Sequence, residues 1–158
     1  MLIIAEAHHN AELVRAIQRF RGAIYAADGA IHELPDGRHI EAADERSWHI
    51  AAFVNAEIAG AIRYERKGAG RVRVGGWCVA AEHRGGRIGI KLALECVHLA
   101  ERLGDTHGHA TATRRHGSAE ILKRLGGRLL ARYWDRSYGC EMEFLEFSLA
   151  LMQSRRAA

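Results

Sequence analysis

The sequence is poor in proline, cysteine and lysine, and it contains no long apolar run. Pro35 is its only proline, and Cys78, Cys96 and Cys140 are its only cysteines among 158 residues. Three cysteines without paired spacing argue against a disulfide framework, so reduced thiols are expected. No apolar run approaches the roughly 20 residues that a membrane span needs, and residues 1–7 are too short and too acidic for a secretion signal. We therefore expect a cytoplasmic protein with no membrane partner.

The composition is that of a globular protein. About 48% of the residues are hydrophobic and 27% are charged, and a chain of this length can bury one sizeable core. We therefore expect a single domain over residues 1–158. The positive charge comes from 20 arginines and only three lysines, with a net charge of +4. Arginine suits the recognition of phosphate and carboxylate groups.

The hydrophobic pattern predicts helices and strands in mixed order. Helical spacing after a cap at Asn10 predicts a helix to Ile24, and the irregular stretch 22–47 is expected to form a loop or short helix near the surface. Glycines 75–76 interrupt the third expected strand, which predicts a bulge where that strand splays. The other expected elements are a hairpin of 48–54 and 58–64, a strand at 71–79, a helix at 88–103 ended by Gly104, a strand at 107–113, a short helix capped by Ser118, and strands at 128–134 and 141–149. This order indicates a mixed α/β layer architecture.

Residues 79–89 carry the strongest functional signal. Their sequence, VAAEHRGGRIG, places small residues directly before a helix N-terminus. Unpaired backbone N–H groups and the helix dipole both favour an anion there, and Arg84 and Arg87 add charge-assisted contacts. We therefore predict that this loop binds the pyrophosphate of a large phosphorylated cofactor.

This segment resembles the acyl-CoA signature of the GCN5-related N-acetyltransferase (GNAT) superfamily, usually written Val-x-Pro-x-x-Arg-Gly-x-Gly-Ile-Gly. Ala81 replaces the usual proline, and Arg87 stands where the middle glycine is expected, with Gly86 one residue earlier. The matching positions are Val79, Arg84, Gly85, Ile88 and Gly89. The order of elements from 48 to 149 is also similar to the family's. The resemblance implies a GNAT-like acyl-CoA N-acyltransferase fold, with a mixed central sheet, a splayed strand and helices on both faces.

The resemblance also implies a cofactor and a reaction. Acetyl-CoA or another acyl-CoA would be the co-substrate, without a metal, and the acyl group would pass by direct attack to a primary amine of a small molecule or a protein. The family's splayed strand binds the pantetheine arm through its backbone, which corresponds to residues 77–79 (Trp77, Cys78 and Val79), and Ser118 joins Gly86 and Arg87 in the implied cofactor site. The tyrosine that often protonates the leaving thiolate aligns with Leu122, so that acid is absent from its usual place. The oligomeric state, a homodimer included, stays open.

Residues near the C-terminus are the candidates for proton transfer. Glu141 and Glu143 share one face of the last strand, and a partly buried Glu143 with a raised pKa would serve as general base. A solvated strand face is the plainer interpretation of both. Tyr138 precedes that strand and could replace the missing acid, although an aromatic residue in a turn more often packs. The pair His107 and His109 lacks a third ligand, so no metal site is predicted.

Three alternatives to this function stay open. The N-terminal third weakly resembles autoinducer and N-acyl amino acid synthases of the same fold, through residues 21–25 and 44–45, and an arginine-rich face including Arg63, Arg66, Arg71 and Arg73 would suit an acyl carrier protein as donor. The altered loop and the missing tyrosine would also suit a module that binds CoA or acyl-CoA without catalysis. Nucleic acid is not expected as a partner, because the arginine pairs 114–115 and 155–156 are short and lack an interleaved aromatic platform.

Overall fold

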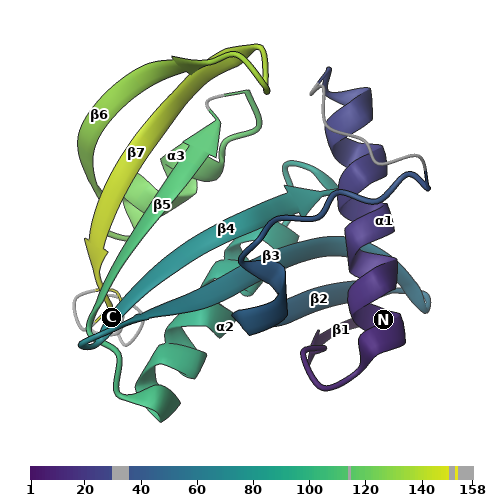
Figure 1. The fold of residues 1–158 in the computed structure, drawn as a ribbon, viewed down its shortest axis with the longest axis horizontal. Helices are drawn as coiled ribbons and strands as arrows, with labels where there is room; N and C mark the ends of the chain where they lie inside the picture. Colours follow the sequence, from purple (N-terminus) through teal and green to yellow (C-terminus); the bar gives the residue numbers. More distant parts are fainter. Residues whose placement is uncertain (30–35, 114, 150–151, 153–158) are drawn as a thin grey trace.

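The centre of the molecule is a seven-stranded mixed sheet, which confirms the predicted fold class (Figure 1). The computed structural model describes residues 1–29, 36–113, 115–149 and 152. Neighbouring strands are antiparallel except β4 and β5, which are parallel. In the sheet order β1-β2-β3-β4-β5-β7-β6, the strands are β1 (Leu2–Glu6), β2 (Trp48–Val54), β3 (Glu57–Gly68), β4 (Arg71–Val79), β5 (His107–Thr113), β7 (Cys140–Ser148) and β6 (Arg128–Asp135).

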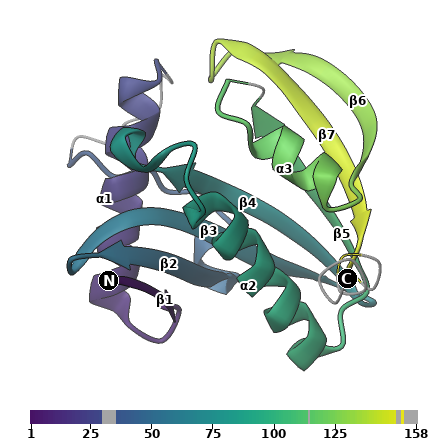
Figure 2. The same cartoon turned by 180° about the vertical axis from the view of Figure 1, so that it is seen from behind.

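Helices cover both faces of this sheet. The helix α1 (Ala11–Ala27) crosses one face, and α2 (Ile88–Leu103) and α3 (Ser118–Arg124) cover the other, as the two opposite views show (Figures 1 and 2). Under α1, Ile17 packs with Ala51 and Ala61. A larger cluster under α2 and α3 includes Leu92 and Leu145, both fully buried. Helices therefore pack against both faces of the sheet.

The sequence predicted most of these elements, with two errors at the N-terminal end. β1 was not predicted, although it pairs with β2 along its whole length. The helix α1 continues to Ala27, past Gly22, where an irregular stretch was expected. Gly22 serves a close backbone approach and not a helix end: a Cβ there would stand 2.1 Å from the carbonyl oxygen of Gly37. Within the expected irregular stretch 22–47, residues 30–35 lie outside the described residues.

The predicted bulge in β4 is confirmed. The pairing of β3 with β4 shifts between Ala61 and Arg63, opposite the stretch from Cys78 back to Gly75. On its other side β4 pairs with β5 for only four residue pairs, from Arg71 to Val74, and then the two strands diverge. The divergence opens the sheet in its middle, as Figure 1 shows.

The helix α2 forms where its spacing predicts and ends at Gly104, which adopts the left-handed conformation (φ +71°) that glycine allows. Its N-terminus, by contrast, has no side-chain cap. The short helix α3 differs from prediction, because Gly117 is its N-cap and the Ser118 hydroxyl donates instead to the Thr113 carbonyl oxygen (3.3 Å). Ser118 therefore ties α3 to the end of β5.

Candidate functional site

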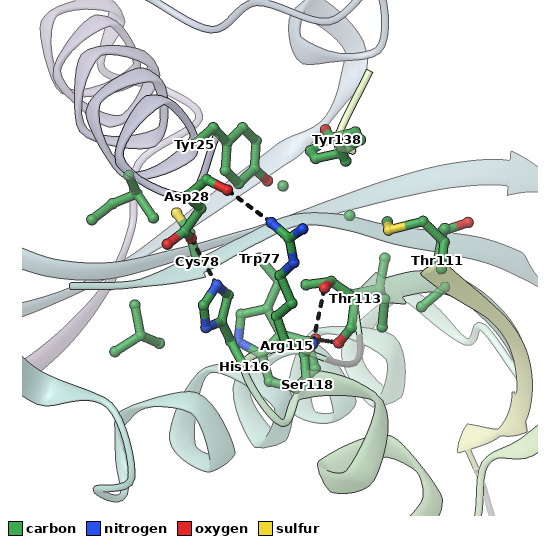
Figure 3. A pocket seen from close by; sticks show the side chains of 18 of the residues that line it. Tyr25, Asp28, Trp77, Cys78, Thr111, Thr113, Arg115, His116, Ser118 and Tyr138 are labelled. Carbon is green, nitrogen blue, oxygen red and sulfur yellow. Dashed lines mark hydrogen bonds and ion pairs between the residues drawn. The ribbon is translucent and has the colours of Figure 1, made fainter. Parts of the chain in front are cut away.

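A cleft of about 1290 Å³, its open mouth included, lies between the diverging ends of β4 and β5. Its walls come from both strands, from the C-terminal end of α1, from the first turn of α2 and from the turn between β6 and β7. A concave site lined by apolar side chains with a few polar groups is the usual setting for a small-molecule ligand. Figure 3 shows side chains from these separate elements facing one another across the cleft.

The loop predicted to bind phosphate forms one end of this cleft. Gly85 has a positive φ of +77°, which turns the chain toward α2. The first intrahelical hydrogen bond of α2 runs from Lys91 N–H to the Arg87 carbonyl oxygen (3.0 Å), so helix geometry leaves the amides of residues 88–90 without an intrahelical acceptor. Gly89, in this first turn, lines the cleft. An uncapped helix N-terminus at a cleft favours an anionic ligand.

The Arg84 side chain turns back from this loop across the end of β4. Its Nε donates to the Val79 carbonyl oxygen (3.0 Å), and its two Nη atoms donate to the two carboxylate oxygens of Asp28 at the end of α1 (3.2 and 3.0 Å). The Asp28 carboxylate also contacts His116 Nε2 (3.0 Å). Asp28 thus joins α1, the phosphate loop and the loop after β5.

The bulged part of β4 forms the floor of the cleft, with Trp77, Cys78 and Val79 among its lining residues. The Cys78 thiol is buried, which raises its pKa to about 12. A thiol with that pKa stays protonated near neutrality and is a poor nucleophile. Cys78 therefore fits a packing role, in line with direct transfer to the acceptor.

Two tyrosines line the cleft, Tyr25 from the last turn of α1 and Tyr138 from the turn between β6 and β7. The rings of Tyr25 and Tyr138 meet edge to face, with centroids 5.5 Å apart. Burial raises the pKa of Tyr138 to about 12 and that of Tyr25 well above its ordinary value. Both hydroxyls therefore stay protonated and can donate hydrogen bonds to a ligand.

Arg115 crosses the cleft mouth from the loop after β5 (Figure 3). Its guanidinium donates to the Asp28 carbonyl oxygen (3.0 Å) and to the Gly139 carbonyl oxygen in the β6–β7 turn (2.7 Å). Its own amide donates to the Thr113 hydroxyl (3.0 Å). Arg115 therefore connects the two elements that carry Tyr25 and Tyr138.

A buried group of charges lies behind the bulge. Asp44 is 4% exposed and accepts from Arg21 and Arg63, each 1% exposed; Arg63 also donates to Glu41 (2.6 Å). Burial alone would raise the pKa of Glu41, but hydrogen bonds from His39 and Arg63 outweigh it and hold that pKa far below its usual range. Glu41 lines the cleft as a carboxylate.

The glycines of the bulge make room for these arginines. A Cβ on Gly75 would stand 3.1 Å from Arg63 Nη2, and one on Gly76 would stand 2.7 Å from Arg21 Nη1. The expected surface role of Arg63 is therefore wrong, because its side chain is buried under β4. Arg66 pairs with Asp105 (2.9 Å). Arg114, Arg155 and Arg156 lie outside the described residues.

The predicted bases lie away from the cleft. Glu143 is fully buried and faces α3, where Lys123 Nζ lies 2.6 Å from one carboxylate oxygen and Arg132 Nε donates to the other (3.0 Å). Burial alone would raise the pKa of Glu143, but these two cations outweigh it and lower it. The expectation of a raised pKa is thus wrong. Glu141, on the same face of β7, is not among the residues that line the cleft, nor are His107 and His109.

Comparison with known families decides the classification. The model of the acetyltransferase (GNAT) family matches residues 13–126, well over half of the chain. The chain belongs to this family. No curated protein matches the sequence, but solved GNAT-like structures resemble its fold, at identities low enough that the likeness concerns the fold alone.

Three of these structures show how far the likeness extends. An acetyltransferase of the GNAT family from Staphylococcus aureus has a TM-score of 0.73 at 18% identity, over 94% of this chain and 99% of that one. Escherichia coli ElaA has a TM-score of 0.75 at 15% identity, over 92% and 99%. BjaI, a CoA-dependent acyl-homoserine lactone synthase, has a TM-score of 0.75 at 12% identity, over 99% and 89%.

Sequence reasoning missed several cleft residues of this GNAT chain. Asp28, Arg115 and His116 were not candidates, and Tyr25 entered only through a family likeness. One signal was available: Arg115 and His116 directly follow β5, and ligands gather at the carboxyl ends of strands in open sheets. Asp28 gave no such signal, because its contact with Arg84 spans 56 residues of chain. In the described part of the chain, no group of three or more His, Cys, Asp or Glu could hold a metal, and no helix could span a membrane.

Proposed function

We propose that this GNAT protein transfers an acetyl or other acyl group from a CoA thioester to a primary amine by direct attack. Family membership supports an acyl-CoA donor. The cleft supports it independently, because it carries unpartnered helix amides suited to a diphosphate and protonated hydroxyls suited to an acceptor. The observation that carries the proposal is the end of β4–β5 pairing at Val74, beside the N-terminus of α2.

In this proposal the amides of residues 85–90 hold the pyrophosphate, and the exposed backbone of Trp77, Cys78 and Val79 holds the pantetheine arm. An N–H of the bulge then donates to the thioester oxygen as negative charge develops there. Glycine keeps position 89 open, since a Cβ there would stand 3.3 Å from Ile121 Cδ1 and 3.7 Å from the Trp77 indole. Any larger side chain at position 89 would enter the space assigned to the cofactor.

The pKa of Tyr138 limits its part in this reaction. A thiol has a pKa of about 8.5, whereas that of Tyr138 is about 12. Full proton transfer from Tyr138 to the leaving thiolate would thus be uphill by roughly 3.5 pKa units. Tyr138 and Tyr25 suit hydrogen-bond donation to the reacting groups better than they suit delivery of a proton.

Replacement of Gly89 tests the cofactor assignment. Gly89→Leu should reduce CoA affinity at least about tenfold, because the new side chain meets Trp77 and Ile121 in the cleft. Isothermal titration of CoA and acetyl-CoA measures this, with thermal unfolding as a check of folding. The matched control is Glu101→Leu, which places the same side chain at an exposed position near the other end of α2; it should leave CoA affinity within about twofold.

Turnover is measured as release of free CoA thiol from acetyl-CoA with a panel of primary amines. Transfer to any of them supports the enzyme assignment. CoA binding without turnover on acetyl-CoA or longer acyl-CoAs would indicate a binding module instead. Equal CoA affinity of Gly89→Leu and the unmodified protein would contradict the assignment of the phosphate loop.

A further inference from the structure

The proposed reaction requires a group that takes a proton from the amine, and most groups in the cleft are unsuited to it. Glu41 is a weak base, because Arg63 and His39 lower its pKa. Asp135 uses a carboxylate oxygen to accept from the amides of Ser137 and Tyr138 (2.8 and 3.2 Å). The two tyrosines are already protonated. The lining residues include one imidazole, that of His116.

His116 is held in a closed ring of three side chains. Its Nε2 lies 3.0 Å from Asp28 Oδ2, and its Nδ1 lies 3.3 Å from Arg84 Nη1. Arg84 in turn donates to both oxygens of Asp28. Figure 3 shows the imidazole below Asp28. Because Arg84 also donates from Nε to the Val79 carbonyl oxygen (3.0 Å), the ring lies at the end of β4, the strand assigned to the pantetheine arm.

The contacts of this ring fix the tautomer of the imidazole. A guanidinium has no acceptor, so Nδ1 must accept from Arg84 and must carry the lone pair. Nε2 then carries the hydrogen and faces Asp28 Oδ2 at 3.0 Å, as in sites where a carboxylate orients a histidine. His116 thus has a basic nitrogen on the side of the phosphate loop, and Arg84 covers it.

Arg84 has a second anion to bind once the cofactor is present. It belongs to the loop assigned to the pyrophosphate, and a guanidinium binds phosphate oxygens through the same charge-assisted, often bidentate hydrogen bonds with which it binds a carboxylate. Movement of Arg84 onto the phosphate would uncover His116 Nδ1 while Asp28 keeps hold of Nε2. The ring would then become a carboxylate–histidine pair that is free to accept a proton.

We infer that His116 is the catalytic residue that carries the proton during acyl transfer, that Asp28 positions it, and that cofactor binding to Arg84 uncovers it. This inference rests on the proposed function. The amine nitrogen attacks the thioester carbonyl carbon, a C–N bond forms, and the amine proton passes to Nδ1. The C–S bond then breaks, and the imidazolium returns the proton to the thiolate. Amine and thioester become amide and thiol, with no net proton gained or lost.

This route agrees with the relative acidities of the groups. In general an imidazolium is a stronger acid than a thiol, so the return of the proton to sulfur is a favourable direction of transfer. The same step from a tyrosine would be uphill. The missing family tyrosine at Leu122 is therefore not needed for this step.

His116→Gln tests the inference in the full-length protein, with acetyl-CoA and the best acceptor of the amine panel as probes. We expect kcat to fall about 100-fold or more, the usual contribution of general acid–base catalysis. The Kd for CoA should stay within about threefold. The matched control His98→Gln changes a histidine on α2 that pairs with Glu95 outside the cleft and should keep the unmodified kcat.

The pH profile separates catalysis from a structural role. In the unmodified protein kcat/KM should fall on the acid side as the imidazole becomes protonated, and His116→Gln should lose that acid limb. Asp28→Asn removes the carboxylate that positions the imidazole, so kcat should fall in the same direction as in His116→Gln, by a smaller factor. Arg84 and Arg115, the cations beside Asp28, remain in place in that variant.

The outcomes distinguish this inference from the proposed function. If the unmodified protein binds no CoA, both are wrong. If CoA binds and His116→Gln keeps the unmodified kcat and acid limb, only this inference is wrong. Loss of activity in His116→Gln through KM for acetyl-CoA alone would also overturn it, because it would make His116 a binding residue.

Discussion

Glu143 illustrates how its surroundings decide what a carboxylate can do. From the sequence it was a candidate base, because it alternates onto one face of the last strand with Glu141. In the structure that face turns toward α3, where Lys123 and Arg132 hold its charge. A carboxylate whose pKa is lowered in this way is a weaker base and a stronger ion-pair partner. Glu143 therefore contributes to the stability of the fold.

Glu143→Gln should lower the free energy of unfolding by about 1–2 kcal/mol at neutral pH, because an amide replaces one partner of two charge-assisted contacts. Activity should stay within about twofold, since Glu143 does not line the cleft. Urea denaturation and the thiol-release assay measure the two effects. A folded variant with unchanged stability but lost turnover would contradict this assignment and make Glu143 a candidate general base again.

The sequence alone predicted some of the helices and strands and missed others. The helix α2 was predictable, because its apolar residues recur at helical spacing over 16 residues and a glycine follows. β1 was not, because five residues at the edge of a sheet have no periodicity of their own and form a strand only through pairing with β2. The glycine motif located one end of the cleft. The sequence did not predict the contacts that join distant segments around the cleft, such as that of Arg84 with Asp28, because no local pattern encodes them.

The bulge in β4 is an element whose glycines have separate, testable roles. Gly76 has a φ of +57°, and a Cβ there would stand 2.7 Å from Arg21 Nη1. Gly76→Ala should therefore combine backbone strain of about 1–2 kcal/mol with a displaced buried arginine. It should also weaken CoA binding, because the bulge forms the cleft floor. Urea denaturation and CoA titration measure both.

Gly68→Ala is the control for backbone strain alone. Gly68 also has a positive φ, +84°, but a Cβ there would meet nothing within 4 Å. This variant should show only the strain, with unchanged CoA affinity. Equal losses of stability in the two variants would show that the contact with Arg21 adds nothing to the requirement for glycine at position 76.

At the scale of the whole molecule, the buried charges around Asp44 connect α1 to the sheet. Asp44 lies in a short 3₁₀ turn (Asp44–Arg46), Arg21 in α1 and Arg63 in β3. Removal of the Asp44 carboxylate leaves the guanidiniums of Arg21 and Arg63 in the interior with too little negative charge beside them. Loss of a partner from such a buried group typically costs about 3–5 kcal/mol. The packing of α1 therefore depends on one carboxylate.

Asp44→Asn should accordingly destabilise the protein by about 3–5 kcal/mol, measured by urea denaturation at neutral pH. Burial alone would raise the pKa of Asp44, but Arg21 and Arg63 outweigh it and lower that pKa. A group of this kind stabilises the fold above its unfolded pKa and loses that effect as the pH falls through the folded value. The stability of the unmodified protein should thus fall below about pH 4, and the fall should be smaller in Asp44→Asn.

The control for this experiment is Asp36→Asn, which removes an exposed carboxylate paired with Arg38. Exposed ion pairs contribute little, so its free energy of unfolding should change by less than about 1 kcal/mol. Similar losses in the two variants would mean that the buried group is no more important than a surface pair.

The early end of the β4–β5 ladder has a consequence for how this sheet meets other molecules. Beyond Val74 and Ala110 the two strands offer ladder N–H and C=O groups to each other across a gap. Such rows are normally found at the outer border of a sheet, where they invite pairing with foreign strands. Here they lie inside the protein, in a cleft lined by residues of α1 on one face of the sheet and of α2 and α3 on the other. The unpaired stretch of this sheet is therefore enclosed by the protein's own helices and is not presented at an outer edge.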